Sequence, residues 1–211
     1  MTKRIYFVRH GETDCNSKNL IQGRGVDAPL NALGHQQAEA FYQHYKHIPF
    51  DKVYTSSLQR THQSMAPLLK SGIPHEIIGG FDEMDFGIME GKEMFDSTGT
   101  FTLKSLLEQW KNNEGDAKAE QGESPNEVLQ RMKDALETVL SRKQEANVVV
   151  CMHGRALRIL MCYLLNLPIS NMEKYFHANL AVSIFDYNYE TGSFSPVCIA
   201  NNAHTEALSI T

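Results

Sequence analysis

Six short apolar runs are spaced along the chain, and longer stretches with helical spacing of apolar positions separate them. The runs are rich in β-branched and aromatic residues, which is typical of strands buried in a sheet. They lie at residues 4–8, 52–55, 75–78, 147–152, 181–187 and 196–200. The last two flank the turn-forming residues 190–193, and this arrangement predicts a hairpin.

The stretches between the runs carry helix signals. Asn31 predicts the N-cap of a helix that reaches about residue 45, with Phe41 on its apolar face. Either Ser56 or Ser57 is expected to cap the next helix. The apolar face of that helix is expected to carry Leu58, Thr61, Met65 and Leu68. Further helices are predicted at residues 101–113, 125–144 and 156–165.

Alternation of strands and helices predicts the α/β class. We expect a three-layer sandwich in which a mainly parallel central sheet has helices on both faces and ends in antiparallel C-terminal strands. The sequence contains no internal repeat, low-complexity tract or linker-like segment. Residues 1–211 are therefore expected to form a single domain, a size for which one hydrophobic core suffices.

Composition narrows the function classes. The formal net charge of −5, from 20 basic and 25 acidic residues, argues against a nucleic-acid binder with a general basic surface. No apolar stretch is long enough to span a membrane, and no leader precedes the first run. The four cysteines lie far apart and form no C-x-x-C pair, which is typical of reduced thiols. These features predict a soluble, cytoplasmic protein without a zinc site.

Two predicted strands end in the same dipeptide, His-Gly. His10-Gly11 follows the first strand, and His153-Gly154 follows the strand at 147–152. Ligands of open α/β sheets gather at the carboxyl ends of the strands, so the two histidines are expected to face one site. The glycines are expected to let the backbone turn sharply and to let a substrate oxygen approach.

Arginines and carboxylates accompany these histidines. Arg9 precedes His10, and Arg60 lies near the start of the helix after the second strand. A planar guanidinium can donate two parallel hydrogen bonds to a phosphoryl group. The loop at residues 81–87 supplies carboxylates that could protonate a departing alkoxide. The sequence thus predicts phosphoryl chemistry that needs neither a metal nor another cofactor.

These residues resemble the signature of the histidine phosphatase superfamily, also called the phosphoglycerate mutase-like family. The resemblance spans nearly the whole chain, in order and at sensible separations. It is carried by Arg9-His10-Gly11-Glu12-Thr13 with Asn16, Gln22-Gly23, the segment 27–34, the segment 54–61, the segment 83–87 with Glu90-Gly91, and His153-Gly154.

The resemblance implies a role for each matching position. His10 would be the nucleophile that becomes a phosphohistidine, and Glu83 would be the proton donor and later the base. Arg9, Arg60 and His153 would hold the phosphoryl oxygens during catalysis. Further phosphate contacts are implied for Asn16, Gln22, Gly23 and Gly154.

The sequence departs from the family pattern at Met89, where a tryptophan is common, and at Arg155, where many relatives carry glycine. Arg155 and Arg24 could contact a second anionic group of the substrate or form structural ion pairs. The resemblance favours a phosphatase acting on a small phosphomonoester. A phosphoglycerate mutase and an inactive phosphate-binding module stay as alternatives. The greater length of the family's mutases argues against the first, and the retained His10, Arg60, Glu83 and His153 argue against the second. Neither the natural substrate nor the oligomeric state follows from the sequence.

Overall fold

Six strands form one sheet in the computed structural model, which describes residues 1–95, 97–100 and 102–210. The strands are β1 (Thr2–Arg9), β2 (Lys52–Thr55), β3 (His75–Ile77), β4 (Asn147–Met152), β5 (Val182–Asn188) and β6 (Ser193–Asn201). Their order across the sheet is β3-β2-β4-β1-β5-β6. All six lie close to the apolar runs from which they were predicted.

The sheet is mixed. Strands β3, β2, β4 and β1 run parallel to one another, whereas β5 pairs antiparallel with β1 and β6 pairs antiparallel with β5. This confirms the predicted α/β class with a mainly parallel sheet and antiparallel C-terminal strands. In the register of β1 with β4, Arg9 lies opposite Met152. Each strand's next residue is a histidine, so the two histidines leave the sheet at the same level.

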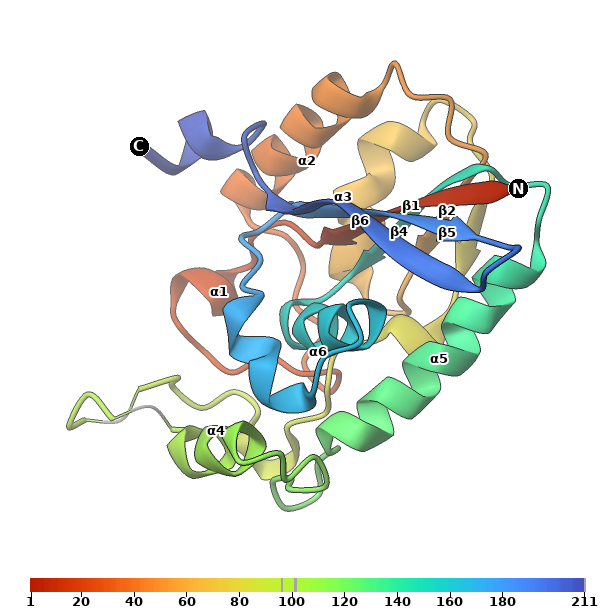
Figure 1. Cartoon of the computed structure of the whole chain (residues 1–211). Helices are drawn as coiled ribbons and strands as arrows, with labels where there is room; N and C mark the ends of the chain where they lie inside the picture. Colours follow the sequence, from red (N-terminus) through yellow and green to blue (C-terminus); the bar gives the residue numbers. More distant parts are fainter. Residues whose placement is uncertain (96, 101, 211) are drawn as a thin grey trace.

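Helices cover both faces of the sheet, as Figure 1 shows. Helices α2 (Ala32–Tyr45) and α3 (Gln59–Leu69) lie on one face. Helices α5 (Pro125–Ser141) and α6 (Gly154–Leu164) lie on the other. The alternation along β1 explains this layering, because Ile5 and Phe7 pack in the core under α5 and α6 while Tyr6 and Val8 pack under α2 and α3.

One helix start follows its predicted cap, and a second has a cap that was not predicted. The Asn31 side chain accepts a hydrogen bond from the Gly34 N–H at the start of α2. Ser124 and Glu127 form a capping box at the start of α5. Helix α6 begins at Gly154, two residues before the predicted start, and α5 ends at Ser141 rather than near residue 144.

The predicted cap of α3 was wrong. Leu58 occupies the N-cap position, and neither Ser56 nor Ser57 caps the helix. The Ser57 hydroxyl instead donates to Asp82 at 2.7 Å. Asp27, from the loop after β1, takes the capping role by accepting from the Gln59 N–H at 2.8 Å. Asp27, which is distant in the sequence, thus caps the helix in place of the two serines.

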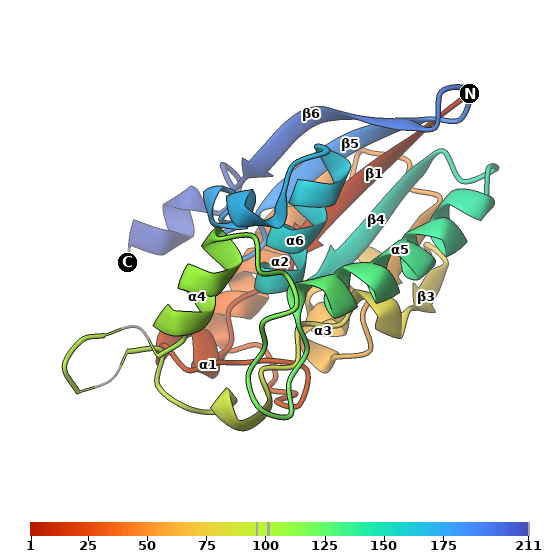
Figure 2. The ribbon, with the colours of Figure 1, turned by 60° about the horizontal axis from the view of Figure 1, so that its bottom comes forward.

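Several short elements had no predicted counterpart. They are α1 (Asp14–Ser17) and the 3₁₀ helices η1 (Gly79–Phe81), η2 (Gly87–Met89), η3 (Ile169–Lys174) and η4 (Glu206–Ile210). The helix predicted at 101–113 is α4 (Lys104–Lys111), and residue 101 lies outside the described residues. Figure 2 shows α4 beside α6, at the end of the sheet where β1 and β4 finish.

Among the described residues, no helix is both long and apolar enough to cross a membrane. The four cysteines are free thiols, in agreement with their spacing. The cytoplasmic location stays a prediction.

Candidate active site

The carboxyl ends of β1 and β4 bring the two predicted histidines together. The ring centroids of His10 and His153 lie 5.2 Å apart, and the ring planes are tilted by 54°. Both side chains are buried. A cavity of about 340 Å³ opens in front of His10. Its lining includes Arg9, Asn16, Gln22, Glu83 and Gly154.

One hydrogen bond determines the tautomer of His10. Its Nδ1 lies 2.7 Å from the Gly11 carbonyl oxygen, which can only accept, so Nδ1 carries the proton. Nε2 is then left with a free lone pair. Burial, together with the positive charges of Arg60 and Arg9, lowers the pKa of His10 well below its usual value. The imidazole is therefore neutral at neutral pH and can act as a nucleophile.

His153 is held from both sides. Its Nδ1 accepts a hydrogen bond from Arg60 Nε at 3.1 Å, so its Nε2 carries the proton and donates to Ser56 Oγ at 2.8 Å. Burial and the nearby positive charge of Arg60 lower the pKa of His153 well below its usual value. Both ring nitrogens thus have partners within the protein, so His153 keeps no free lone pair for nucleophilic attack.

Arg60 joins the site to the loop after β1. Besides His153, its guanidinium donates to the carbonyl oxygens of Val26 at 2.8 Å and Gly23 at 3.1 Å. Within the described part of the chain, the cavity lining includes neither Arg60 nor His153. Arg60 retains one further N–H on each terminal nitrogen, because a guanidinium carries five donors.

Two buried donors at the cavity have no hydrogen-bond partner. Within the described residues they are Arg9 Nε and Gln22 Nε2, and no other buried side-chain nitrogen or oxygen lacks a partner. Arg9 Nη1 donates to the His177 carbonyl oxygen at 2.7 Å, and Gln22 Oε1 accepts from the Thr13 hydroxyl at 2.8 Å. Burial lowers the pKa of Arg9 to about 10, which leaves it charged at neutral pH. An unpaired buried donor costs about 1–3 kcal/mol, so both are suited to an anionic ligand.

Asn16, in α1, contacts the C-terminal segment through Asn179. Its Oδ1 accepts from the Thr13 N–H and from Asn179 Nδ2, each at 3.2 Å. Asn179 Nδ2 also lies 3.0 Å from the His10 carbonyl oxygen. With its oxygen engaged in this way, Asn16 can offer its NH₂ group to a ligand in the cavity.

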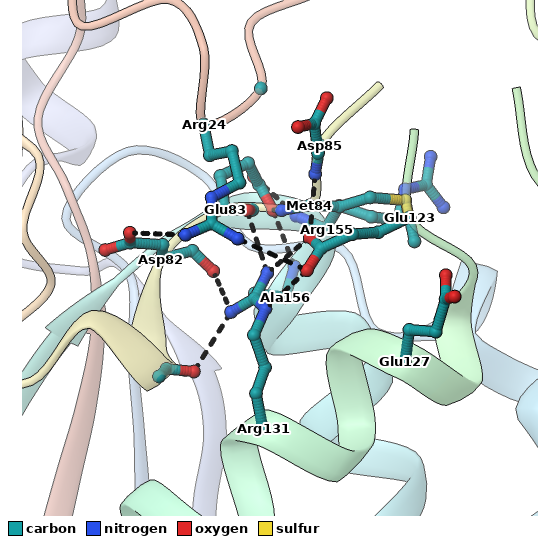
Figure 3. A network of polar contacts seen from close by, with 12 residues as sticks. Arg24, Asp82, Glu83, Met84, Asp85, Glu123, Glu127, Arg131, Arg155 and Ala156 are labelled. Carbon is teal, nitrogen blue, oxygen red and sulfur yellow. Dashed lines mark hydrogen bonds and ion pairs between the residues drawn. The ribbon is translucent and has the colours of Figure 1, made fainter. Parts of the chain in front are cut away.

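Glu83 sits at the start of α6, as Figure 3 shows. Its Oε1 accepts from the N–H groups of Met84 and Ala156 at 2.9 Å, and its Oε2 accepts from the Arg155 N–H at 3.0 Å. The first turn of a helix has unpaired N–H groups that suit a carboxylate. Arg131 Nη2 supports the same loop by donating to the Glu83 carbonyl oxygen at 2.9 Å. The carboxylate is thus held at a defined place on the cavity wall.

The glycine of each His-Gly pair makes room for another part of the protein. A Cβ on Gly11 would lie 2.8 Å from the Gly34 carbonyl oxygen, so Gly11 makes room for the start of α2. A Cβ on Gly154 would lie 3.3 Å from Arg9 Nε. Neither glycine has a positive φ. The required room is therefore for the protein's own backbone and for Arg9.

The remaining sequence candidates make structural contacts. Arg24 pairs with Asp82 at 3.5 Å and with Glu123 at 3.4 Å, and it does not line the cavity described here. Arg155 does line the cavity and is ion-paired with Glu173. Met89, which replaces the common tryptophan, packs partly buried against the larger core cluster.

Several contributing residues were given no role in the site by the sequence. Ser56 accepts from His153, Asn179 and the His177 carbonyl tie the C-terminal segment to His10 and Arg9, and Arg131 supports the Glu83 loop. All act through contacts between segments far apart in the chain. Among the described residues, no group of three or more histidine, cysteine, aspartate or glutamate side chains could hold a metal ion.

Comparison with known sequences adds a family context. The profile of the histidine phosphatase superfamily (branch 1) matches residues 5–199. The protein named "Probable phosphoglycerate mutase GpmB" of Cronobacter sakazakii is 33% identical over 190 residues, which cover 87% of this chain and 85% of that protein. The protein of the same name from Proteus mirabilis is 31% identical over 190 residues, with the same shares of both chains covered.

Solved structures share the fold. YhfR of Bacillus stearothermophilus superposes with a TM-score of 0.85 at 23% identity, covering 97% of this chain and all (100%) of that one. The phosphoserine phosphatase of Entamoeba histolytica, solved in complex with 3-phosphoglyceric acid, gives a TM-score of 0.82 at 23% identity. That match covers 96% of this chain and 98% of the phosphatase. At such identities the likeness concerns the fold alone.

Proposed function

Because this chain belongs to the histidine phosphatase superfamily (branch 1), we propose that it hydrolyses a small phosphomonoester through a phosphohistidine formed on His10. Glu83 is the general acid and then the general base in this proposal. The reaction requires neither a metal ion nor another cofactor. Proteins of both kinds, phosphatases and a mutase by name, occur among the relatives and structural neighbours.

One observation carries the proposal. The Nδ1–H of His10 is tied to the Gly11 carbonyl, so its free Nε2 faces a cavity that also holds the unpartnered donors of Arg9 and Gln22. A nucleophilic lone pair beside buried, unpaired donors suits an anion that is attacked at its central atom. A phosphoryl group fits this description, because its non-bridging oxygens need donors while its phosphorus is attacked.

The first step forms the phosphoenzyme. The Nε2 lone pair of His10 forms a bond to phosphorus, and the bond from phosphorus to the ester oxygen breaks. The departing oxygen takes a proton from the Glu83 carboxyl group and leaves as an alcohol. Arg9, with the amide groups of Gln22 and Asn16, stabilises the charge on the phosphoryl oxygens.

The second step returns the enzyme to its starting state. A water molecule gives a proton to the Glu83 carboxylate and forms the new bond to phosphorus. The bond between phosphorus and Nε2 breaks, and inorganic phosphate leaves. Arg60 supports both steps, since its positive charge keeps the His10 imidazole neutral, and its hydrogen bond holds the His153 ring that lies beside the His10 ring.

The test is hydrolysis of p-nitrophenyl phosphate with EDTA present. We expect turnover by the wild-type protein and loss of at least about 10³-fold in the His10→Ala variant, because no other group takes over as nucleophile. The exposed His47 offers a matched control, and His47→Ala should retain full activity. Activity that survives in His10→Ala would contradict the phosphohistidine route, and activity abolished by EDTA would contradict the absence of a metal.

A mutase is the alternative that the names of the sequence relatives favour. Chain length does not separate the two activities, since the match covers 85% of the relative named mutase. The phosphatase proposal predicts that 3-phosphoglycerate, if accepted, releases inorganic phosphate. Conversion to 2-phosphoglycerate without phosphate release would favour the mutase. Binding of phosphate without turnover of any ester would favour an inactive binding module.

A further inference from the structure

Two kinds of side chain line the cavity. His10, Arg9 and the other donors described above form its polar part. The apolar part consists of Leu20, Ile21, Phe86, Met94, Leu103 and Leu107. Phe176, an aromatic side chain that is 59% exposed, also lines the cavity. A leaving group attached to a phosphoryl group at His10 can lie against these apolar side chains.

Two arginines also line the cavity, but a carboxylate of the protein already occupies them. Arg155 and Arg158 lie one turn apart on α6, and Glu173 of η3 reaches both. Arg155 Nη1 pairs with Glu173 Oε1, and Arg158 Nη1 lies 2.5 Å from Glu173 Oε2. Each carboxylate oxygen thus serves one guanidinium, in the way that an anionic substrate group would.

Aromatic rings hold the same guanidinium groups in place. Arg155 lies over the Trp110 ring at 5.4 Å from its centroid, and Arg158 lies over the Phe176 ring at 5.2 Å. The side chains of Arg155 and Arg158 are 10% and 17% exposed, and that of Glu173 is 29% exposed. Stacking and ion pairing together stabilise this arrangement, so turning either arginine toward a second anion would cost these contacts.

Glu173 therefore opposes the binding of a second anion at these two arginines. A substrate carboxylate would have to displace Glu173 from a paired, partly buried position or bind beside its negative charge. Electrostatic repulsion between like charges is strong where water is partly excluded. An uncharged apolar group meets no such opposition and removes apolar surface from water.

We infer that Glu173 is a specificity-determining residue, and that the substrate is a phosphomonoester whose leaving group is apolar and uncharged, such as an aryl or alkyl group. This inference rests on the proposed phosphatase function. It excludes small carboxylated esters such as phosphoglycerates as preferred substrates. Glu173 acts by occupying the two arginines that would otherwise bind the carboxylate.

The test compares two aryl esters, 4-ethylphenyl phosphate and 4-(carboxymethyl)phenyl phosphate. They have leaving oxygens of similar basicity and differ in one carboxylate. We expect the wild-type kcat/KM to favour the ethyl compound by about tenfold or more, a difference typical of one charged group in such a site. Glu173→Gln should reduce this ratio by about tenfold, chiefly through a lower KM for the carboxylated ester.

Two variants serve as controls. Glu173→Asp keeps the negative charge and should keep the preference. Glu137→Gln, on the exposed side of α5, removes one negative charge from the molecule without touching the cavity, and its ratio should equal that of the wild type. A change in Glu137→Gln equal to that in Glu173→Gln would attribute the effect to net charge and overturn the inference.

The outcomes separate the two proposals. Hydrolysis of both esters with a wild-type ratio near one, or with a preference for the carboxylated ester, overturns the specificity inference and leaves the phosphatase function intact. A ratio that Glu173→Gln leaves within twofold of the wild-type value does the same. The wild-type ratio decides the question even if Glu173→Gln does not fold. Hydrolysis of neither ester, nor of p-nitrophenyl phosphate, overturns the phosphatase function itself.

Discussion

At the scale of single residues, one backbone carbonyl decides what His10 can do. The Gly11 oxygen holds the proton on Nδ1, and burial beside Arg60 and Arg9 keeps the ring from gaining a second proton. The adjacent His153 is held neutral by the same causes, with its proton on the opposite nitrogen. Of the two histidines, only His10 keeps a free lone pair at the cavity, so only His10 can act as a nucleophile.

A residue-scale prediction concerns the titration of His10. Because burial lowers the pKa of His10, the ring should stay neutral as pH falls through 6.5, where an exposed histidine takes up its proton. NMR of the imidazole C–H signals, assigned with His10→Ala, should show no titration of His10 as pH falls through this value. A His10 midpoint at or above pH 6.5 would contradict a neutral, buried nucleophile.

At the scale of elements, helix starts position the functional groups. The start of α6 holds the Glu83 carboxylate through the N–H groups of Arg155 and Ala156. The start of α3 carries Arg60 and depends on Asp27 for its cap. Because Gln59 Nε2 also donates to the Asp27 carbonyl oxygen, the loop and the helix hold each other in place.

The prediction at this scale is a cost for removing that cap. Asp27→Ala should lower the free energy of unfolding by about 1 kcal/mol, because the Gln59 N–H loses its acceptor and the helix loses a favourable charge at its start. Asp27→Asn keeps an acceptor and should lose less. Urea unfolding of both variants measures the difference. Equal losses in the two, or none in Asp27→Ala, would show that Asp27 is not the cap.

At the scale of the whole molecule, folding places uncharged histidines in the interior. Besides His10 and His153, His177 is buried between the Tyr175 carbonyl and the Ser183 hydroxyl, at 2.9 Å and 2.7 Å. Burial lowers the pKa of His177 to about 4. The carbonyl of this residue accepts from Arg9, so its placement also affects the site.

This burial predicts that stability falls in mild acid. The unfolded chain binds a proton on each such histidine below about pH 6.5, whereas folded His177 does not until about pH 4. Between about pH 6.5 and about pH 4, acid therefore favours the unfolded state, by up to about 1.4 kcal/mol per pH unit for each such histidine.

Urea unfolding between pH 7 and pH 5 should show this loss. The His177→Gln variant should lose less with pH than the wild type, by about 1 kcal/mol or more over that range. His47→Gln, which alters an exposed histidine, should keep the wild-type dependence. A His177→Gln slope equal to that of the wild type would mean that His177 titrates alike in the folded and unfolded states.

Much of the fold and the chemistry could be predicted from local patterns. The six apolar runs became the six strands, and Asn31 caps α2 as its sequence context indicated. The two His-Gly ends were expected at one site, and their rings lie 5.2 Å apart. The predicted cap of α3 was wrong because a long-range partner competed with the local signal. The Ser57 hydroxyl donates to Asp82 and does not cap the helix.

The sequence by itself determined the order of the elements, the α/β class and the family, because hydrophobic periodicity, turn residues and motif spacing are local properties of the chain. Only the tertiary structure decided which side chains from distant parts of the chain meet. It placed Asn179 against His10, 169 positions away, and Glu173 between Arg155 and Arg158. Such contacts depend on how loops and helices pack against one another at the edge of the sheet. No local pattern encodes that packing, and the substrate preference we infer depends on it.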